Sequence, residues 1–322
     1  MEEGLISLPS SLPDTISTEA KVLIESYFAF LANKADTTSI TYRQTTEEFL
    51  QFVGSKFSIG RVEDINRNHI IFYRKALENK GLAHKTILKK LSAVSSFCKF
   101  LGFEGFIDKD ITYGIKRPKT QNKRETAGLT DDEVRRIFET MNSKSHSYHL
   151  HKAILAVGFY TGLRSQEIRS IRMESYGKAQ GHTVLKAVIK GAKNHIIPLN
   201  PFVVRAIDDL IERKQELDHE ISDKSYLFSS LKFKLNKPLK PNSLKHIFDS
   251  ALKRAGIETN NKLIRHSPHS MRASLASHLL NSKDTPLEDV QRLLGHSSPT
   301  TTQKYNKRVK SMDKSPVYRI DY

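Results

Sequence analysis

The residues best suited to covalent chemistry lie near the end of the sequence. Tyr305 follows His296 by nine positions, in a stretch that reads Leu-Gly-His-Ser-Ser-Pro-Thr-Thr-Thr-Gln-Lys-Tyr. A tyrosine hydroxyl can form a covalent bond to phosphorus when neighbouring groups activate it. Its ordinary pKa is about 10, so it needs nearby cations or a proton acceptor before it can attack. Groups of both kinds occur earlier in the chain.

The first candidate cation, Arg164, stands in a turn that reads Thr-Gly-Leu-Arg. Gly162 lets the backbone approach a ligand closely, and a guanidinium presents a planar fork that fits two phosphate oxygens. Glu167 follows one helical turn later and is expected to orient Arg164 or a neighbouring histidine. Taken alone, this turn is better explained by a surface arginine paired with Glu167, and only the other groups favour a catalytic role.

The second group is the pair His269 and Arg272, which are three residues apart and therefore share one face of a helix. Arg272 is expected to join Arg164 as a second clamp on a phosphate. His269 would hydrogen-bond that phosphate or transfer protons near pH 7. Pro268 places His269 at the start of the helix, where the helix dipole also favours an anion.

These groups together suit phosphoryl transfer on a nucleic-acid backbone, because fixed cations stabilise the charge that develops on phosphate oxygens. The overall charge points to the same partner. The chain has 52 basic against 35 acidic residues, a formal net charge of +17 and a pI of about 9.7. This excess is typical of proteins that bind polyanions.

The residue set and its order resemble the tyrosine recombinase family, which includes phage integrases and Xer-type recombinases. The resemblance covers nearly the whole chain and is strongest from Leu129 to Asn306. The family signature combines an arginine in a Thr-Gly-Leu-Arg turn, a lysine on a β-hairpin, His-x-x-Arg, and Leu-Gly-His followed nine residues later by tyrosine. Every part occurs here in that order.

The resemblance implies a role for each residue. Tyr305 would attack a phosphodiester, form a 3′-phosphotyrosyl bond and release a 5′-hydroxyl, without metal, cofactor or ATP. His296 would donate a hydrogen bond to a phosphate oxygen. Lys190, the hairpin lysine by alignment, would protonate the leaving 5′-oxygen. Ile189 replaces the glycine that usually precedes this lysine, and Lys193 is the rival for the same role.

The resemblance also implies an assembly, a homo-tetramer on two double-stranded DNA recombination sites with a dimer on each. An accessory protein or a second recombinase is a further expected partner. Integration, excision and resolution remain open as biological roles. We expect a Xer-like or mobile-element enzyme, because the chain lacks the additional N-terminal arm-binding domain of some integrases. The C-terminal tail, with apolar Val317, Tyr318 and Ile320, is expected to dock on a neighbouring subunit or else on its own domain.

Two other functions remain open. A type IB topoisomerase uses the same chemistry, and a non-catalytic DNA-binding protein could keep the same scaffold. A metal site is not expected. His146, His149 and His151 are close in sequence but have no cysteine or carboxylate beside them, so they are interpreted as a polar loop.

Composition favours a cytoplasmic protein with sizeable hydrophobic cores, since 38% of the residues are hydrophobic. The one cysteine, Cys98, cannot form an intramolecular disulfide. The N-terminus lacks the basic segment of a secretory signal. The longest apolar stretch, Ala153 to Tyr160, is too short to span a bilayer.

A chain of 322 residues suits two domains, and the pattern predicts a mainly α protein. Residues 1–16 are expected to form a flexible arm, 17–115 an all-α, four-helix, DNA-binding domain, and 116–127 a basic linker. Residues 128–322 would form a mostly helical catalytic domain that contains a small antiparallel sheet and ends in the tail.

In the first domain, helices are predicted at about 18–33, 38–53, 66–79 and 85–101. Gly54, Gly81 and Gly102 fall where a helix end needs a left-handed residue. The first helix is expected to bury one face of apolar residues, namely Val22, Leu23, Tyr27, Phe30 and Leu31.

In the second domain, helices are predicted at about 149–160, 201–216, 242–255, 269–280 and 287–294. Strands at about 184–190 and 195–199 form the one clear β-hairpin. Thr130 and Glu133 match a capping box that opens the domain. Thr285 and Glu288 match a second one, with Pro286 at the first helical position.

Overall fold

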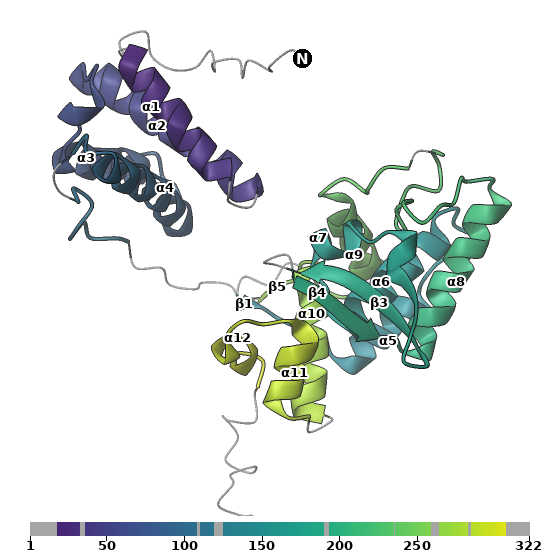
Figure 1. Ribbon diagram of the computed structural model, residues 1–322. Coiled ribbons are helices and arrows are strands. Elements are labelled where there is room, and N and C mark those ends of the chain that lie inside the picture. The colour runs from purple at the N-terminus through teal and green to yellow at the C-terminus, as the bar shows by residue number, and fades with distance from the viewer. Residues whose placement is uncertain are drawn as a thin grey trace, which may run out of the picture. The chain divides into compact units, whose positions relative to one another are not determined.

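The computed structural model describes residues 18–32, 36–107, 110–118, 125–189, 193–234, 236–258, 264–282 and 285–306. The chain divides into two units, Met1–Gln121 and Asn122–Tyr322 (Figure 1). The predicted arm at 1–16, the tail after Asn306 and the hairpin lysine Lys190 lie outside the described residues. Within the described part, no helix is both long and apolar enough to cross a bilayer.

The first unit is a bundle of four helices, as predicted. They are α1 (Thr18–Ala32), α2 (Asp36–Phe57), α3 (Arg67–Asn79) and α4 (His84–Phe103). The buried face of α1 differs from the expected one. Ile24 and Phe28 are buried, whereas Val22 and Phe30 are 64% and 50% exposed. The predicted face was therefore rotated by about one residue, because Leu23, Tyr27 and Leu31 belong to both the predicted and the buried face.

Two of the three predicted glycine helix ends were wrong. The helix α2 continues through Gly54, which is buried, and the left-handed residue at its end is Ser58, with φ of 55°. Gly102 lies inside α4. Only Gly81 has the predicted left-handed backbone, with φ of 69°. A glycine in a helical sequence therefore does not by itself mark the end of the helix.

In the second unit, one face of a small sheet packs against helices and the other is exposed (Figure 1). Its helices are α5 (Asp131–Glu139), α6 (Tyr148–Thr161), α7 (Ser165–Arg169), α8 (Pro201–Glu216), α9 (Ser243–Arg254), α10 (His269–Ser277), α11 (Leu287–Leu294) and α12 (Pro299–Gln303). The antiparallel sheet has the order β2 (Tyr176–Ala179), β3 (His182–Ile189) and β4 (Lys193–Pro198). A short parallel pair joins β1 (Glu125–Thr126) to β5 (Ile264–Arg265).

Close helix packing places the segments that matter for the site. The helix α6 is buried along most of its length and packs against α10, because Gly158 leaves room for the Met271 side chain. A Cβ atom at Gly158 would lie 2.4 Å from the Met271 sulfur. The helix α6 ends at Gly162, whose left-handed backbone has φ of 65°. The chain therefore turns sharply before Arg164.

The capping predictions had different outcomes. The Thr130–Glu133 box is confirmed, since the Thr130 amide donates to Glu133 Oε2 at 2.8 Å and the Glu133 amide donates to Thr130 Oγ1 at 3.3 Å. The Thr285–Glu288 box was wrong. Pro286 is the N-cap of α11 and makes no side-chain capping bond, so Thr285 lies one residue too early. The predicted helix at 269–280 changes to a π-helix at His278–Ser282.

A buried lysine, Lys214, holds the loop that follows α8. Its side chain is only 3% exposed, and its ammonium donates to the Tyr226 carbonyl at 2.8 Å and to Ser229 Oγ at 2.9 Å. Neither partner carries a charge, so burial lowers the pKa of Lys214 to about 8.

We expect this lysine to make stability rise with pH. Below about pH 8 Lys214 is charged in both the folded and the unfolded chain, and the burial penalty is present in full. Between about 8 and the ordinary value of 10.5, only the unfolded chain binds the proton, so the folded state gains stability as pH rises. The free energy of unfolding, measured against Lys214→Met, should rise by roughly 3 kcal/mol across this range. An unchanged difference between the two proteins would contradict the assignment.

Candidate active site

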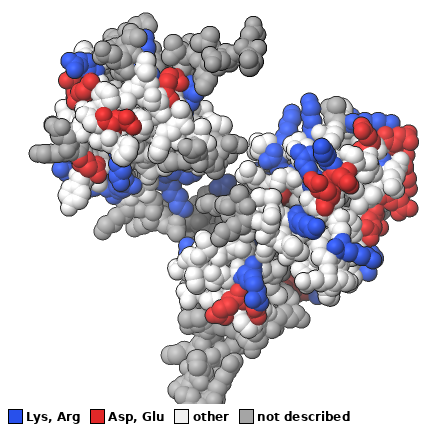
Figure 2. Space-filling view, viewed as in Figure 1, with Lys and Arg blue, Asp and Glu red and all other residues white. Residues whose placement is uncertain are grey.

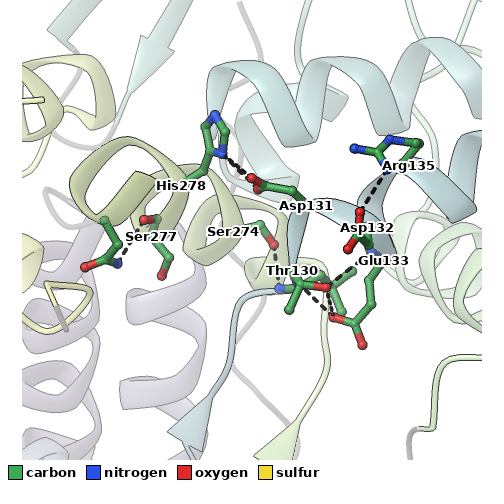
Figure 3. Close-up of polar contacts among 10 residues, drawn as sticks. Thr130, Asp131, Asp132, Glu133, Arg135, Ser274, Ser277 and His278 are labelled. Carbon is green, nitrogen blue, oxygen red and sulfur yellow. Dashed lines mark hydrogen bonds and ion pairs between the residues drawn. The ribbon is translucent and has the colours of Figure 1, made fainter. Parts of the chain in front are cut away.

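The helix α10 carries His269 and Arg272 in its first turn. Residues at the start of α5 hold its C-terminal half in place. The Leu129 amide donates to Ser274 Oγ at 2.7 Å, and His278 Nδ1 pairs with Asp131 at 2.8 Å. Figure 3 shows these contacts beside the Thr130 capping box. Gly128 fits against the α10 backbone where a Cβ atom would lie 2.7 Å from the Ser274 nitrogen. The catalytic candidates on α10 therefore stand on a rigid element.

Arg272 is the most deeply buried of the candidate residues, with 2% exposure. Its Nη1 donates to the Gly162 carbonyl at 2.7 Å, its Nη2 to the Leu294 carbonyl, and its Nε to His296 Nε2 at 3.3 Å. The two carbonyls lie at the C-terminal ends of α6 and α11, where helix dipoles favour a cation. Burial and the Arg164 charge lower the pKa of Arg272 to about 10, so it stays protonated at neutral pH.

Arg164 lies where the chain enters α7, and Glu167 orients it. The buried Glu167 carboxylate accepts from the Arg164 amide at 2.7 Å and from Arg164 Nη1 at 2.8 Å. About a third of the Arg164 side chain remains exposed (34%). Its charge acts on the rest of the cluster, since it contributes to lowering the pKa values of Arg272, His269 and His296. The sequence-based pairing of Arg164 with Glu167 thus occurs within a larger charged cluster.

His296 follows Gly295, whose left-handed backbone (φ of 61°) ends α11. Its ring is 8% exposed and lies between two partners, with Nε2 receiving the Arg272 bond and Nδ1 lying 2.8 Å from Thr302 Oγ1. Burial, followed by the charges of the two arginines, lowers the pKa of His296 to about 4. The imidazole is therefore neutral at physiological pH.

Tyr305 points its hydroxyl at the first turn of α10. Its Oη lies 3.2 Å from His269 Nε2, and its ring stacks on His296 with 6.5 Å between centroids and 15° between planes. Burial raises the pKa of Tyr305, while the charges of Arg272 and Arg164 oppose that rise. Burial and the same two charges lower the pKa of His269. A neutral His269 can accept the phenol proton, so this pair is suited to activating the hydroxyl.

The β3–β4 hairpin is attached to the end of α11 on both of its strands. The Ile189 side chain packs on Gly295, where a Cβ atom would lie 2.5 Å from Ile189 Cδ1. On the other strand, His195 Nε2 donates to the Leu293 carbonyl at 2.8 Å. The hairpin turn with Lys190, and the Lys193 side chain, lie outside the described residues. Neither proposed general acid is therefore located.

The structure brings together the predicted residues Arg164, Glu167, His269, Arg272, His296 and Tyr305. Other tyrosines could in principle act as the nucleophile. Tyr160 packs on Phe202 from α6, with 5.5 Å between the ring centroids. Tyr318 and Tyr322 lie outside the described residues.

Sequence analysis missed three residues that contact this cluster. They are Thr302 beside His296, Gln291, whose side-chain amide donates to the His296 carbonyl at 3.0 Å, and Asn281, whose amide donates to the Tyr305 carbonyl at 3.1 Å. No signal could single out Thr302 among three consecutive threonines. The polar side chains Asn281 and Gln291 resemble ordinary helix-surface residues.

The arrangement is suited to transferring a phosphoryl group to the tyrosine. It provides a phenol, a neutral imidazole that can accept its proton, and two arginine charges next to both. Such fixed cations stabilise developing negative charge without reorganising during the reaction.

Comparison with protein families gives two matches along the chain. The Phage integrase family matches residues 128–312, which is more than half of the chain. The Phage integrase, N-terminal SAM-like domain matches residues 24–105.

Individual relatives are similar over nearly their whole length. Tyrosine recombinase XerC from Bacillus subtilis (strain 168) is 28% identical over 306 residues, covering 93% of this chain and 94% of the relative. Tyrosine recombinase XerD from Staphylococcus aureus (strain Mu50 / ATCC 700699) is 28% identical over 296 residues, covering 90% and 95%.

Solved structures share the fold. XerH site-specific recombinase bound to palindromic difH substrate has a TM-score of 0.68 at 16% identity, covering 96% of this chain and 92% of that one. A lambda integrase (75–356) dimer bound to a COC′ core site has a TM-score of 0.67 at 18% identity, covering 89% and 94%. At such identities the likeness establishes the fold and no more.

Proposed function

The chain belongs to the phage integrase family of site-specific DNA recombinases, and we propose that Tyr305 is the nucleophile with which it breaks and rejoins DNA strands. The observation that carries this proposal is the 3.2 Å contact between Tyr305 Oη and His269 Nε2, made within reach of the charges of Arg164 and Arg272. Tyr160, another described tyrosine, packs on Phe202 and lies outside this cluster.

In the proposed first step, Tyr305 Oη attacks the scissile phosphorus and its proton passes to His269 Nε2. The bond from phosphorus to the 5′-oxygen breaks as the bond to tyrosine forms. Lys190 gives a proton to the departing 5′-oxygen. Arg164 and Arg272 stabilise the negative charge on the two non-bridging oxygens, and Glu167 keeps Arg164 in position.

The second step reverses the first with another strand. A 5′-hydroxyl from the partner duplex attacks the 3′-phosphotyrosyl phosphorus, loses its proton to Lys190 and restores the phosphodiester, while the tyrosine regains its proton. The number of phosphoester bonds stays constant, so the exchange needs no ATP. In this scheme the arginine charges stabilise the negative charge on the phosphate, so the reaction requires no metal ion. We therefore expect cleavage to persist in excess EDTA.

The distribution of charge favours one side of the catalytic unit for DNA. Residues 232–254 contain seven basic residues and one acidic residue, whereas 208–223 contain seven acidic and two basic. Acidic side chains gather on the edge of this unit where α8 lies (Figure 2). We propose that the segment at 232–254, which includes α9, contacts the phosphate backbone of DNA, and that the acidic edge faces away from the DNA.

The remaining parts of the proposal follow the family. Residues 17–115 would form the second DNA-binding domain, with 116–127 as a basic linker. Four protomers would act on two sites, a dimer on each, with an accessory protein or a second recombinase as a further partner. Structures such as a lambda integrase tetramer bound to a Holliday junction support this arrangement. The tail after Asn306 would dock on a neighbouring subunit. One natural role of the enzyme would be recombination of a mobile element.

The test is to trap the protein on DNA. Genomic DNA from the source cell is incubated with the protein, covalent complexes are isolated in detergent, and the junctions are sequenced. We expect covalent complexes at a small set of related sites. A nicked duplex built on a mapped junction should then accumulate the adduct. Cleavage near the nick releases a short fragment that carries the 5′-hydroxyl, and its loss prevents rejoining. Absence of any covalent complex would leave a non-catalytic DNA-binding protein.

A type IB topoisomerase is the second candidate, because its reaction is the same. The two functions differ in their dependence on a site. A recombinase should act on supercoiled plasmid only when a mapped junction is present. Equal relaxation of a plasmid without that site would favour the topoisomerase.

A substrate whose leaving group needs no proton should restore the cleavage rate that is lost when the proposed general acid is replaced. Lys190→Ala should cleave the mapped site about 100-fold more slowly, because the departing 5′-oxygen lacks a proton donor. A 5′-phosphorothiolate duplex should restore the rate, since a thiolate leaves without a proton. The measurement is the single-turnover cleavage rate with both duplexes. Rescue of Lys193→Ala in place of Lys190→Ala would move the role to Lys193.

A further inference from the structure

The His296 ring has a defined proton position in the free protein. Arg272 Nε donates to His296 Nε2, and a guanidinium cannot accept a hydrogen bond, so Nε2 must be the unprotonated nitrogen. The single proton of the neutral ring therefore lies on Nδ1. It points to Thr302 Oγ1, 2.8 Å away, which acts as the acceptor.

This proton position is the reverse of the one needed during cleavage. We extend the proposed function by giving His296 the role that the family resemblance implies, a hydrogen bond donated to a phosphate oxygen. The contact with Arg272 indicates that Nε2 is the nitrogen facing that site. A neutral imidazole has only one N–H group. Binding of DNA must therefore leave the proton on Nε2 and a lone pair on Nδ1. Solvent supplies one proton to Nε2 and takes up the proton that leaves Nδ1 when the contact with Thr302 opens, so the ring stays neutral.

The partner at Nδ1 has to serve both forms of the ring. A carboxylate or a carbonyl can only accept, and a backbone N–H or an ammonium can only donate. A hydroxyl can do either by rotating its own proton. Thr302 provides such a hydroxyl, and its side chain is fully buried, with 0% exposure. Water thus cannot replace it easily.

We infer that Thr302 is a positioning residue whose hydroxyl holds the His296 ring in both neutral tautomers, as acceptor in the free protein and as donor when a phosphate occupies the site. The second half of this inference rests on the proposed function. Thr302 also lies at the end of α12, and its carbonyl accepts from the Tyr305 amide at 3.0 Å. The same residue therefore connects the His296 ring to the backbone of the proposed nucleophile.

The first test reads the tautomer directly. The full chain, labelled with ¹⁵N in its histidines, is measured by long-range ¹H–¹⁵N NMR without DNA. We expect His296 as the Nδ1–H tautomer in the wild type and in Thr302→Ser, and a mixture of tautomers in Thr302→Val. The exposed neighbour Thr301 offers a matched control, and Thr301→Val should leave the spectrum unchanged. An Nε2–H tautomer in the free wild type would overturn the inference.

The second test measures cleavage of the nicked duplex built on a mapped junction. Thr302→Val should slow single-turnover cleavage about five- to tenfold, the effect of one buried hydrogen bond, and Thr302→Ser should restore it. In a His296→Ala background, Thr302→Val should cause no further slowing. Equal slowing in both backgrounds, or none in either, would overturn the inference. Wild-type cleavage by His296→Ala would instead remove the proposed role of His296, and the NMR measurement would still test the Thr302 contact.

Discussion

Tyr305→Phe should abolish covalent attachment to DNA and leave DNA affinity within about twofold of the wild type. The substitution removes one hydroxyl, whose described contact is the one with His269 Nε2. The ring can keep its stacking on His296, and the arginine charges remain to bind phosphate. Phenylalanine has no oxygen with which to form a bond to phosphorus, so the loss of attachment should be complete.

The measurement is adduct formation on the nicked duplex, together with a gel-shift titration for affinity. Tyr160→Phe is the matched control, because Tyr160 is 39% exposed on α6 and packs on Phe202, away from the cluster. The control should form the adduct at the wild-type rate. A detergent-resistant adduct with Tyr305→Phe would show that another residue is the nucleophile.

Arg272→Ala and Arg164→Ala should both slow cleavage by about 10²–10³-fold, because each removes a charge that stabilises the transition state. Their effects on folding should differ. Arg272 is buried and donates to two helix-terminal carbonyls and to His296, so its loss leaves several buried acceptors without a partner. Arg164 is partly exposed, and its described partner is Glu167.

We expect the free energy of unfolding to fall by about 2–4 kcal/mol in Arg272→Ala and by about 1–2 kcal/mol in Arg164→Ala, where the buried Glu167 carboxylate keeps its bond from the backbone amide of residue 164. Urea titration of both variants beside the wild type measures this difference. Equal stability of the two variants would contradict the conclusion that the hydrogen bonds of Arg272 to the ends of α6 and α11 stabilise the fold. Cleavage near the wild-type rate in either one would remove that arginine from the proposed mechanism.

The sequence predicted the identity of the clustered residues much better than their local geometry. The motifs around Arg164, Arg272, His296 and Tyr305 were readable because each combines a reactive side chain with a fixed spacing. Apart from the pairing of Arg164 with Glu167, their contacts were not readable. The expectation of two arginine clamps did not include the three structural bonds of Arg272, because carbonyls at the ends of α6 and α11 carry no side-chain signal.

The limits in the fold have similar causes. The start of α8 at Pro201 was predictable because proline is favoured at the first helical position. The strand β2 was missed because Tyr-Gly-Lys-Ala has no β-branched residue, and pairing with β3 alone makes it a strand. Gly54 appeared to end α2, yet the helix continues through this buried glycine to Phe57.

The position of Arg272 also bears on how such a protein would lose its activity over generations. Because this one side chain connects the ends of α6 and α11, replacing it would lower the stability of the fold as well as the rate of the reaction. Tyr305 and Arg164 carry no comparable folding cost. A descendant selected only to occupy DNA would therefore shed its tyrosine and its exposed arginine first and retain the buried one. In sequences of this kind, an intact His-x-x-Arg motif is evidence of a preserved fold, and the tyrosine and the Thr-Gly-Leu-Arg turn are the better indicators of an active enzyme.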